Sequence, residues 1–217
     1  LKIFGFNMLD SQYNAPGEEL FFNNNIDEYL SNLRNAFSSQ SKKMIYELAK
    51  EIKNTWLNKK SIFICGNGGS GANAIHMAND FLYGVGVDNN GMKIKSGLKV
   101  EALTANNAVI TCLANDIGYD FIFSEQINTK AEKDDILLVL SGSGNSKNIL
   151  NAVNLANQNG LKTFAILGFK GGKCKKIVQN PIHFEINNMR ISEDLQMIVC
   201  NILVEWLNNN YFDNEKK

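Results

Sequence analysis

The chain has 217 residues, of which 44% are hydrophobic, and this length suits one domain with a substantial core. Its 22 basic residues are balanced by 22 acidic ones, so the chain lacks the basic footprint of a nucleic-acid or anionic-membrane binder. No stretch approaches the roughly 20 consecutive apolar residues that a membrane span needs.

The N-terminal part combines an irregular stretch with two amphipathic patterns. Residues 1–24 show no clear period, and we expect an irregular segment there. Residues 25–58 predict two helices whose apolar stripes pack either on their own subunit or against another one. These stripes include Leu30, Leu33, Phe37, Leu48, Ile52 and Trp56.

From residue 61 onward, apolar strands alternate with helices. Strands that are apolar throughout predict a parallel sheet covered on both faces, which is a three-layer αβα sandwich of five strands. We expect a single domain over residues 25–217, with its αβα core at 61–217. Ser192 is expected to open the last helix, because Glu193 and Asp194 would lie in its first turn. The predicted strands are 61–65, 98–105, 134–140, 162–169 and 180–187.

Two strands run directly into loops of glycine, serine and asparagine, "GNGGSG" at 66–71 and "SGSGNS" at 141–146. Ligands of parallel sheets bind at the carboxyl ends of strands, where glycines and backbone N–H groups can approach an anion. The alternative interpretation is a pair of tight turns. Neither loop has the Walker or dinucleotide pattern, so we expect a phosphate site without a nucleotide cofactor.

The cysteines and histidines give weaker signals. Cys65, Cys112, Cys174 and Cys200 have no C-x-x-C spacing, which favours free thiols in a reducing compartment and hence the cytoplasm. His183 lies in the predicted fifth strand, where a structural role is expected.

The segments "CGNGGSGANAIHMAND", "LANDIGYD", "SGSGNSKNIL" and "GGK", in this order, resemble the sugar isomerase (SIS) domain. More narrowly, they resemble phosphoheptose isomerases, which convert sedoheptulose 7-phosphate to glycero-manno-heptose 7-phosphate for surface polysaccharide such as lipopolysaccharide or capsule. The resemblance implies an SIS fold, a phosphorylated sugar as substrate, and a homotetramer or dimer. It also implies sites between subunits and N-terminal helices in the assembly.

Matched motifs imply roles for individual residues. Asp80, Gln196 and Asp116 would serve catalysis, and His76, Asp80 and Gln196 would bind zinc or another divalent metal. Because His76 and Asp80 are spaced i, i+4, they share a helix face, and Cys200 is either a further ligand or a buried apolar residue. The implied substrate-binding residues are Asn67, Gly68, Gly69, Ser70, Asn115, Asp116, Ser141, Gly142, Ser143, Ser146 and Gln196.

The chain departs from the family pattern at several positions. Asp80 stands where a glutamate base is usual, Gly142 replaces a threonine of the serine loop, and Val204 replaces a histidine eight residues after Gln196. Two functions follow as hypotheses: an aldose–ketose isomerase of a phosphosugar, or a non-catalytic phosphosugar-binding protein with a regulatory or protein-partner role. A dehydrogenase is excluded because its glycine fingerprint and acidic residue are missing.

Overall fold

The computed structural model describes residues 17–88 and 90–212, which form two separate compact units. The first unit, Leu1–Asn35, contains helix α1 (Glu18–Asn35). Residues 18–24, predicted to be irregular, are therefore helical. Glu18 and Glu19 lie in the first turn, where negative charge stabilises the N-terminus of a helix. The predicted irregularity of residues 1–16 lies outside the described residues.

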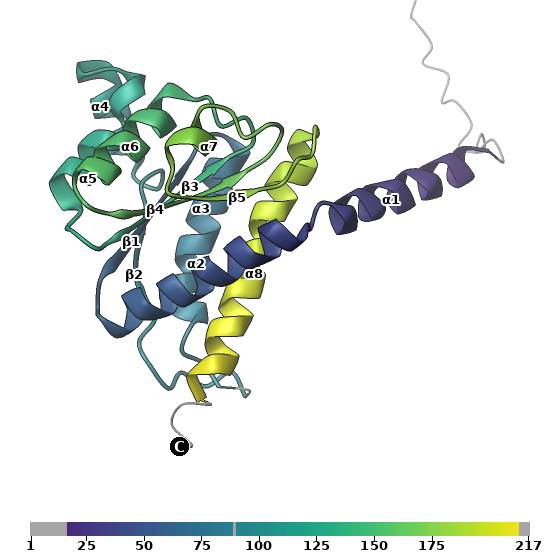
Figure 1. Cartoon of the computed structure of the whole chain (residues 1–217), viewed down its shortest axis with the longest axis horizontal. Coiled ribbons are helices and arrows are strands. Elements are labelled where there is room, and N and C mark those ends of the chain that lie inside the picture. Colours follow the sequence, from purple (N-terminus) through teal and green to yellow (C-terminus); the bar gives the residue numbers. More distant parts are fainter. Residues whose placement is uncertain (1–16, 89, 213–217) are drawn as a thin grey trace, which may run out of the picture. The chain divides into compact units, whose positions relative to one another are not determined.

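The second unit, Ala36–Lys217, contains the predicted sheet (Figure 1). Its five strands are parallel, in the order β2-β1-β3-β4-β5. The strands are β1 (Ser61–Gly66), β2 (Lys99–Ala102), β3 (Ile136–Ser141), β4 (Lys162–Leu167) and β5 (Asn180–His183). The helices are α2 (Ser39–Leu57), α3 (Gly69–Asn79), the π-helical η1 (Asp80–Gly84), α4 (Asn107–Asp116), η2 (Tyr119–Phe121), α5 (Ser124–Lys130), α6 (Lys147–Gln158), α7 (Cys174–Ile177) and α8 (Met189–Phe212).

Helices cover both faces of the sheet, as the apolar strands predicted (Figure 1). On one face, α5 and α6 pack with alternate residues of the central strands, among them Phe63, Leu137 and Ala165. Helices α2, α3 and α8 cover the opposite face. None of the described helices is long and apolar enough to cross a membrane.

For the second predicted stripe, the structure favours one of the two alternatives, because Leu48 and Ile52 of α2 have no exposed surface and so pack in the core of their own subunit. One expectation about the last helix is wrong. Helix α8 begins at Met189, before Ser192. The Oδ1 atom of Asn188 accepts from the N–H of Ile191 at 3.2 Å, whereas the Ser192 hydroxyl donates to the Asn188 carbonyl.

The topology places the two glycine loops at one point of the sheet. The chain leaves β1 toward β2 on one side, and β3 lies on the other side. Gly66 pairs in register with Leu140, so β1 and β3 end beside each other. This reversal of strand order is where open parallel sheets form a crevice for ligands.

Candidate functional site

The loop after β1 is joined by a pair of asparagines to the first turn of α6, the helix that follows the serine loop. Asn67 and Asn148 exchange hydrogen bonds, with the Nδ2 of each donating to the Oδ1 of the other at 3.0 and 2.9 Å. The Tyr119 hydroxyl also donates to Asn67 Oδ1 at 2.9 Å. Sequence reasoning assigned no role to Asn148 or Tyr119, although "LANDIGYD" and "SGSGNSKNIL" contain them. The network fixes the predicted "NGGS" loop against the serine loop.

The serine loop is ordered by its own hydroxyl oxygens. Ser141 Oγ accepts from the Gly144 N–H at 3.0 Å, and Ser143 Oγ accepts from the Asn145 N–H at 3.3 Å. Ser146 caps α6 by position, but its side chain makes no capping bond. A serine hydroxyl has one donor and two acceptor sites, so these contacts leave the donors of Ser141 and Ser143 available to an anion.

A second glycine-rich turn, after β4, supports the serine loop from behind. The N–H of Gly168 donates to the Gly142 carbonyl at 3.1 Å, and the N–H of Cys174 donates to the Gly144 carbonyl at 2.9 Å. Gly144 has φ 64°, and a Cβ there would collide with the backbone of Gly171. The two turns therefore pack backbone to backbone, which explains the "GG" of the "GGK" motif.

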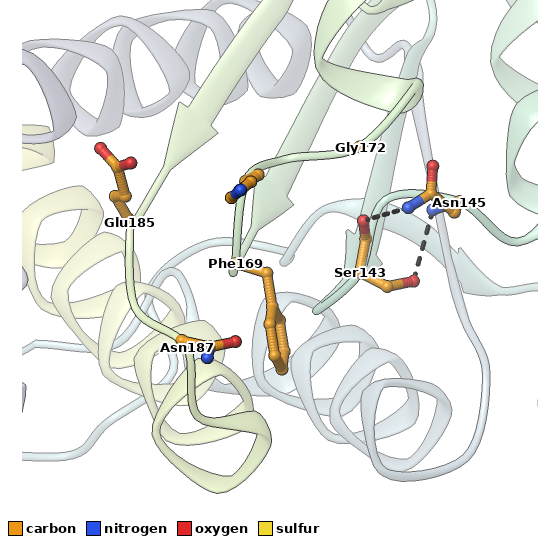
Figure 2. A pocket seen from close by; sticks show the side chains of 7 residues that line it. Ser143, Asn145, Phe169, Gly172, Glu185 and Asn187 are labelled. Carbon is orange, nitrogen blue, oxygen red and sulfur yellow. Dashed lines mark hydrogen bonds between the residues drawn. The ribbon is translucent and has the colours of Figure 1, made fainter.

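A pocket of about 440 Å³ opens at this edge (Figure 2). Ser143 and Asn145 of the serine loop form one wall, and the Phe169 ring lies between Ser143 and Asn187. The rest of the lining comes from the turn after β4, with Lys170 and Gly172, and from Glu185 after β5. A second pocket of about 280 Å³ opens at Asn67, Gly68 and Tyr119. The serine loop thus has space around it for a ligand.

Gln196 lies on a seam between α3 and α8. Its Nε2 donates to Ser70 Oγ at 3.0 Å, and its Oε1 accepts from Asn73 Nδ2 at 2.9 Å. With 1% of its surface exposed, the side chain is buried at the start of α3. Its roles toward substrate and metal stay predictions. Glu193, for which no role in the site was predicted, places its carboxylate where a side chain on Gly69 would be, so a larger residue at position 69 would have to displace that carboxylate.

His76 and Asp80 lie further along the same seam. His76 Nε2 is 3.1 Å from Asp80 Oδ2, as the i, i+4 spacing predicted. The α-helix turns into the π-helix η1 at Asp80, a distortion that is frequent at functional sites. The opposite side of the seam carries Cys200, whose pKa is raised to about 12 by burial and then by the charge of Asp80.

Val204 occupies the end of this seam. A Cβ on Gly84 would lie 3.7 Å from Val204 Cγ1 and 3.8 Å from the Cβ of Asp80. Val204 and Asp80 therefore both adjoin Gly84, and Val204 holds the position of α8 at which the family pattern has a histidine.

The predicted residues on or beside α3 form two groups within one chain. Gly69 and Ser70 stand at the serine-loop end of α3, and Asp80 stands at its other end. At a rise of about 1.5 Å per residue, Asp80 lies roughly 16 Å along the helix axis from Gly69. The serine-loop group and the Asp80 group are therefore at different ends of the helix.

Asn115 and Asp116 end helix α4 and are exposed. Asn115 Nδ2 donates to Asp116 Oδ1 at 2.8 Å, and the Cys112 thiol donates to Asp116 Oδ2 at 3.4 Å. The pKa of Cys112 is raised by this hydrogen bond and by the carboxylate charge. The described contacts of this pair join it to Cys112 and not to the serine loop, so its predicted contact with substrate stays a prediction.

The residues present do not fit a tightly held metal within one chain. Across residues 17–88 and 90–212, no three His, Cys, Asp or Glu side chains gather as a ligand set. His76 and Asp80 give two ligands, and the amide of Gln196 is bonded to Ser70 and Asn73. Cys200 is a buried thiol, whereas the thiolate is the form that binds zinc.

Known proteins resemble this chain in sequence and in fold. The profile of the SIS domain family matches residues 25–168. A phosphoheptose isomerase of Pelodictyon phaeoclathratiforme is 36% identical over 149 residues, which cover 68% of each chain. One of Glaesserella parasuis is 34% identical over 161 residues, covering 74% of this chain and 79% of the relative. The structure of a phosphoheptose isomerase from Francisella tularensis superposes with a TM-score of 0.78 at 25% identity, covering 88% of this chain and 98% of that one.

Proposed function

This chain belongs to the SIS domain family, in the branch of the phosphoheptose isomerases, and we propose that it converts sedoheptulose 7-phosphate into glycero-manno-heptose 7-phosphate. Such a product would feed the synthesis of a surface polysaccharide. The observation that carries the proposal is the ordered serine loop, tied through Asn148 to Asn67, in a chain with this relationship.

The serine loop supplies the ground-state affinity. Ser141, Ser143 and Ser146 would donate to the phosphate oxygens, and the first turn of α6 would add backbone N–H groups and the positive end of its dipole. Hydrogen bonds to a charged group contribute about 1.5–3 kcal/mol each. The loop therefore anchors the substrate by the end that does not react.

The chemistry needs a base at the other end of the sugar. Asp80 would take the proton from C1 of the ketose, which gives an enediol, and the proton would return to C2 to form the aldose. His76, 3.1 Å from Asp80, would hold the carboxylate in place. Asp116 would orient hydroxyl groups or carry a proton between the oxygens.

A second chain would bring the two groups of residues together. Asp80 lies about 16 Å from Gly69 along α3, and a base must come within about 3–3.5 Å of the reacting carbon. Leu82 and Tyr83, next to Asp80, are 58% and 71% exposed, which is unusual for neighbouring apolar side chains. We propose a homotetramer, or at least a dimer, in which Asp80 of one chain faces the serine loop of another. Light scattering that finds a monomer at micromolar concentration would contradict this.

The metal and the compartment also stay proposals. A divalent ion would take His76 and Asp80 as ligands, and it needs further ligands from outside this set. Elemental analysis of the purified protein, with activity measured before and after a chelator, decides whether a divalent ion is present.

The four cysteines are free, which supports a reducing, cytoplasmic compartment.

Val204 favours the alternative function, a phosphosugar-binding protein without turnover. It places an apolar side chain beside Asp80, where the family pattern has a histidine that binds metal and transfers protons. Such a protein would bind the phosphosugar through the serine loop and act on a partner.

Incubation with sedoheptulose 7-phosphate in D2O separates these functions. The isomerase produces new anomeric proton signals by NMR, with deuterium at C2 of the aldose. Asp80→Asn, which keeps the size of the side chain, should abolish these signals and leave binding nearly intact. Binding without any aldose signal from the unchanged protein would refute the isomerase and support the binding protein.

A further inference from the structure

Phe169 adopts a backbone conformation that bulky residues rarely take. It follows strand β4 and has φ 44°, in the left-handed region where a side chain crowds its own carbonyl. Strain of this kind persists only where the surroundings hold it, and it gathers at functional sites. Phe169 is therefore a residue whose position the fold fixes against its own preference.

Both backbone groups of Phe169 are held by the segment that contains β5. Its N–H donates to the Ile186 carbonyl at 3.0 Å, and its carbonyl lies 2.9 Å from His183 Nε2. Lys175 Nζ is 3.0 Å from the other ring nitrogen of His183. An ammonium group can only donate, so Nδ1 is the acceptor and Nε2–H donates to the Phe169 carbonyl. His183 is thus a positioning residue for Phe169.

The held backbone directs the Phe169 ring into the pocket beside the serine loop. Figure 2 shows the ring between Ser143 and Asn187, and all three line the pocket of about 440 Å³. A Cβ on Gly142 would lie 3.7 Å from the ring and 2.5 Å from Met189 Sδ. The end of the Met189 side chain therefore occupies the space that a Cβ at position 142 would need, and the Phe169 ring lies in van der Waals contact with that space.

This geometry suits the carbon chain of a phosphosugar. A phosphate on Ser143 would place the adjoining carbons along the ring, whose face packs against C–H groups. Asn187 and Glu185, on the far wall, offer amide and carboxylate groups to sugar hydroxyls. The lining also carries one charge of each sign, the ammonium group of Lys170 and the carboxylate of Glu185, so hydroxyl and N–H donors place the phosphate at the serine loop.

We propose that Phe169 is a specificity-determining residue, whose ring contacts the substrate's carbon chain next to the phosphate. This inference rests on the proposed function, because it assigns a further contact to the same phosphosugar site. The Phe169 ring would contact only the sugar part of the ligand, whereas the phosphate would contact only the serine loop.

Calorimetric titration of each variant with sedoheptulose 7-phosphate and with inorganic phosphate tests the proposal. Phe169→Ala should weaken binding of the sugar phosphate about tenfold and change phosphate binding less than about twofold, because only the sugar meets the ring. Phe169→Gly should weaken binding of the sugar phosphate by the same factor. Its melting temperature should be no lower than that of Phe169→Ala, because glycine accepts φ 44° without strain. Phe169→Tyr keeps the ring, and Lys176→Ala, on the neighbouring helix α7, is the control; neither should change the ratio of the two affinities.

The proposal would be overturned if Phe169→Ala left both affinities unchanged. It would also be overturned if the variant lowered both affinities by the same factor, because that result indicates a structural role alone. Unchanged protein that binds the sugar phosphate no better than phosphate would also overturn it. A different result would show that only the proposed isomerase function is wrong. The protein would then bind sedoheptulose 7-phosphate in preference to phosphate and lose this preference in Phe169→Ala, but it would produce no aldose.

Discussion

Replacing Asn148 by alanine should lower the free energy of unfolding by about 3 kcal/mol, because three hydrogen bonds meet at this side chain. Two of them join Asn148, in the first turn of α6, to Asn67 in the loop after β1, and in the third Asn148 Oδ1 accepts from the Ile149 N–H at 2.9 Å. The two bonds to Asn67 contribute about 1 kcal/mol each. Ile149 is buried, so leaving its N–H without an acceptor adds about 1 kcal/mol more.

Urea unfolding at a fixed protein concentration measures this loss, and an unchanged m-value is required for the comparison. Asn151→Ala is the matched control, because Asn151 lies on the same helix and donates one hydrogen bond, to the Asp120 carbonyl at 2.9 Å. It should lose only about 1 kcal/mol. In the same variants, the affinity for phosphosugar should fall for Asn148→Ala and stay unchanged for Asn151→Ala.

Two results would refute this reasoning. One is an equal loss of stability in Asn148→Ala and Asn151→Ala. The other is a double-mutant cycle between Asn67→Ala and Asn148→Ala whose coupling energy is below about 0.5 kcal/mol, which is the range found for independent sites. Either outcome would mean that the two loops are positioned by the sheet and not by the asparagine pair.

Ser143→Ala should weaken phosphosugar binding about tenfold to a hundredfold, because a hydrogen bond to a charged group contributes about 1.5–3 kcal/mol, and unchanged affinity would reduce the loop to a turn. Asp116→Asn should speed thiol labelling of Cys112 at pH 8, since removing the carboxylate lowers the raised pKa of Cys112 and so increases its thiolate. If Asp116 contacts substrate, sedoheptulose 7-phosphate should protect Cys112 from labelling. The double variant Val204→His with Asp80→Glu should gain heptose isomerase activity or bound metal if the unchanged protein is a non-catalytic binder. If the unchanged protein is already an enzyme, the double variant should lose activity, because the imidazole would occupy the volume that valine fills.

The fold follows from local patterns in the sequence, and this explains which parts were predictable. The three central strands, β1, β3 and β4, are short and mostly apolar, so their burial on both faces could be inferred one segment at a time. The start of α1 could not, because residues 18–24 have no regular apolar stripe, and their helix depends on charge at its first turn. The cap of α8 was misplaced because Ser192 and Asn188 both suit that role.

The candidate site was predictable where a loop carries its own chemistry. The serine loop orders itself through contacts over two or three residues, which a motif contains entirely. Asn148, Tyr119 and Phe169 were missed because their partners are distant in sequence; Asn148 and Asn67 are 81 residues apart. A polar residue on the apolar face of α6 was the available signal for Asn148, because a buried amide needs a partner.

The change at position 204 also alters how the carboxylate at position 80 is held. In the family pattern, a histidine from the last helix would face that carboxylate across the seam. Here Val204 stands at that place, and Asp80 is bonded within its own segment, to His76 at 3.1 Å and to Asn79 at 3.2 Å. A shorter carboxylate suits this arrangement, because an i, i+4 partner on the same helix is near. If Asp80 acts as the proposed base, its partner at this point is therefore His76 of the same segment, whereas the valine of α8 supplies neither an acid nor a base.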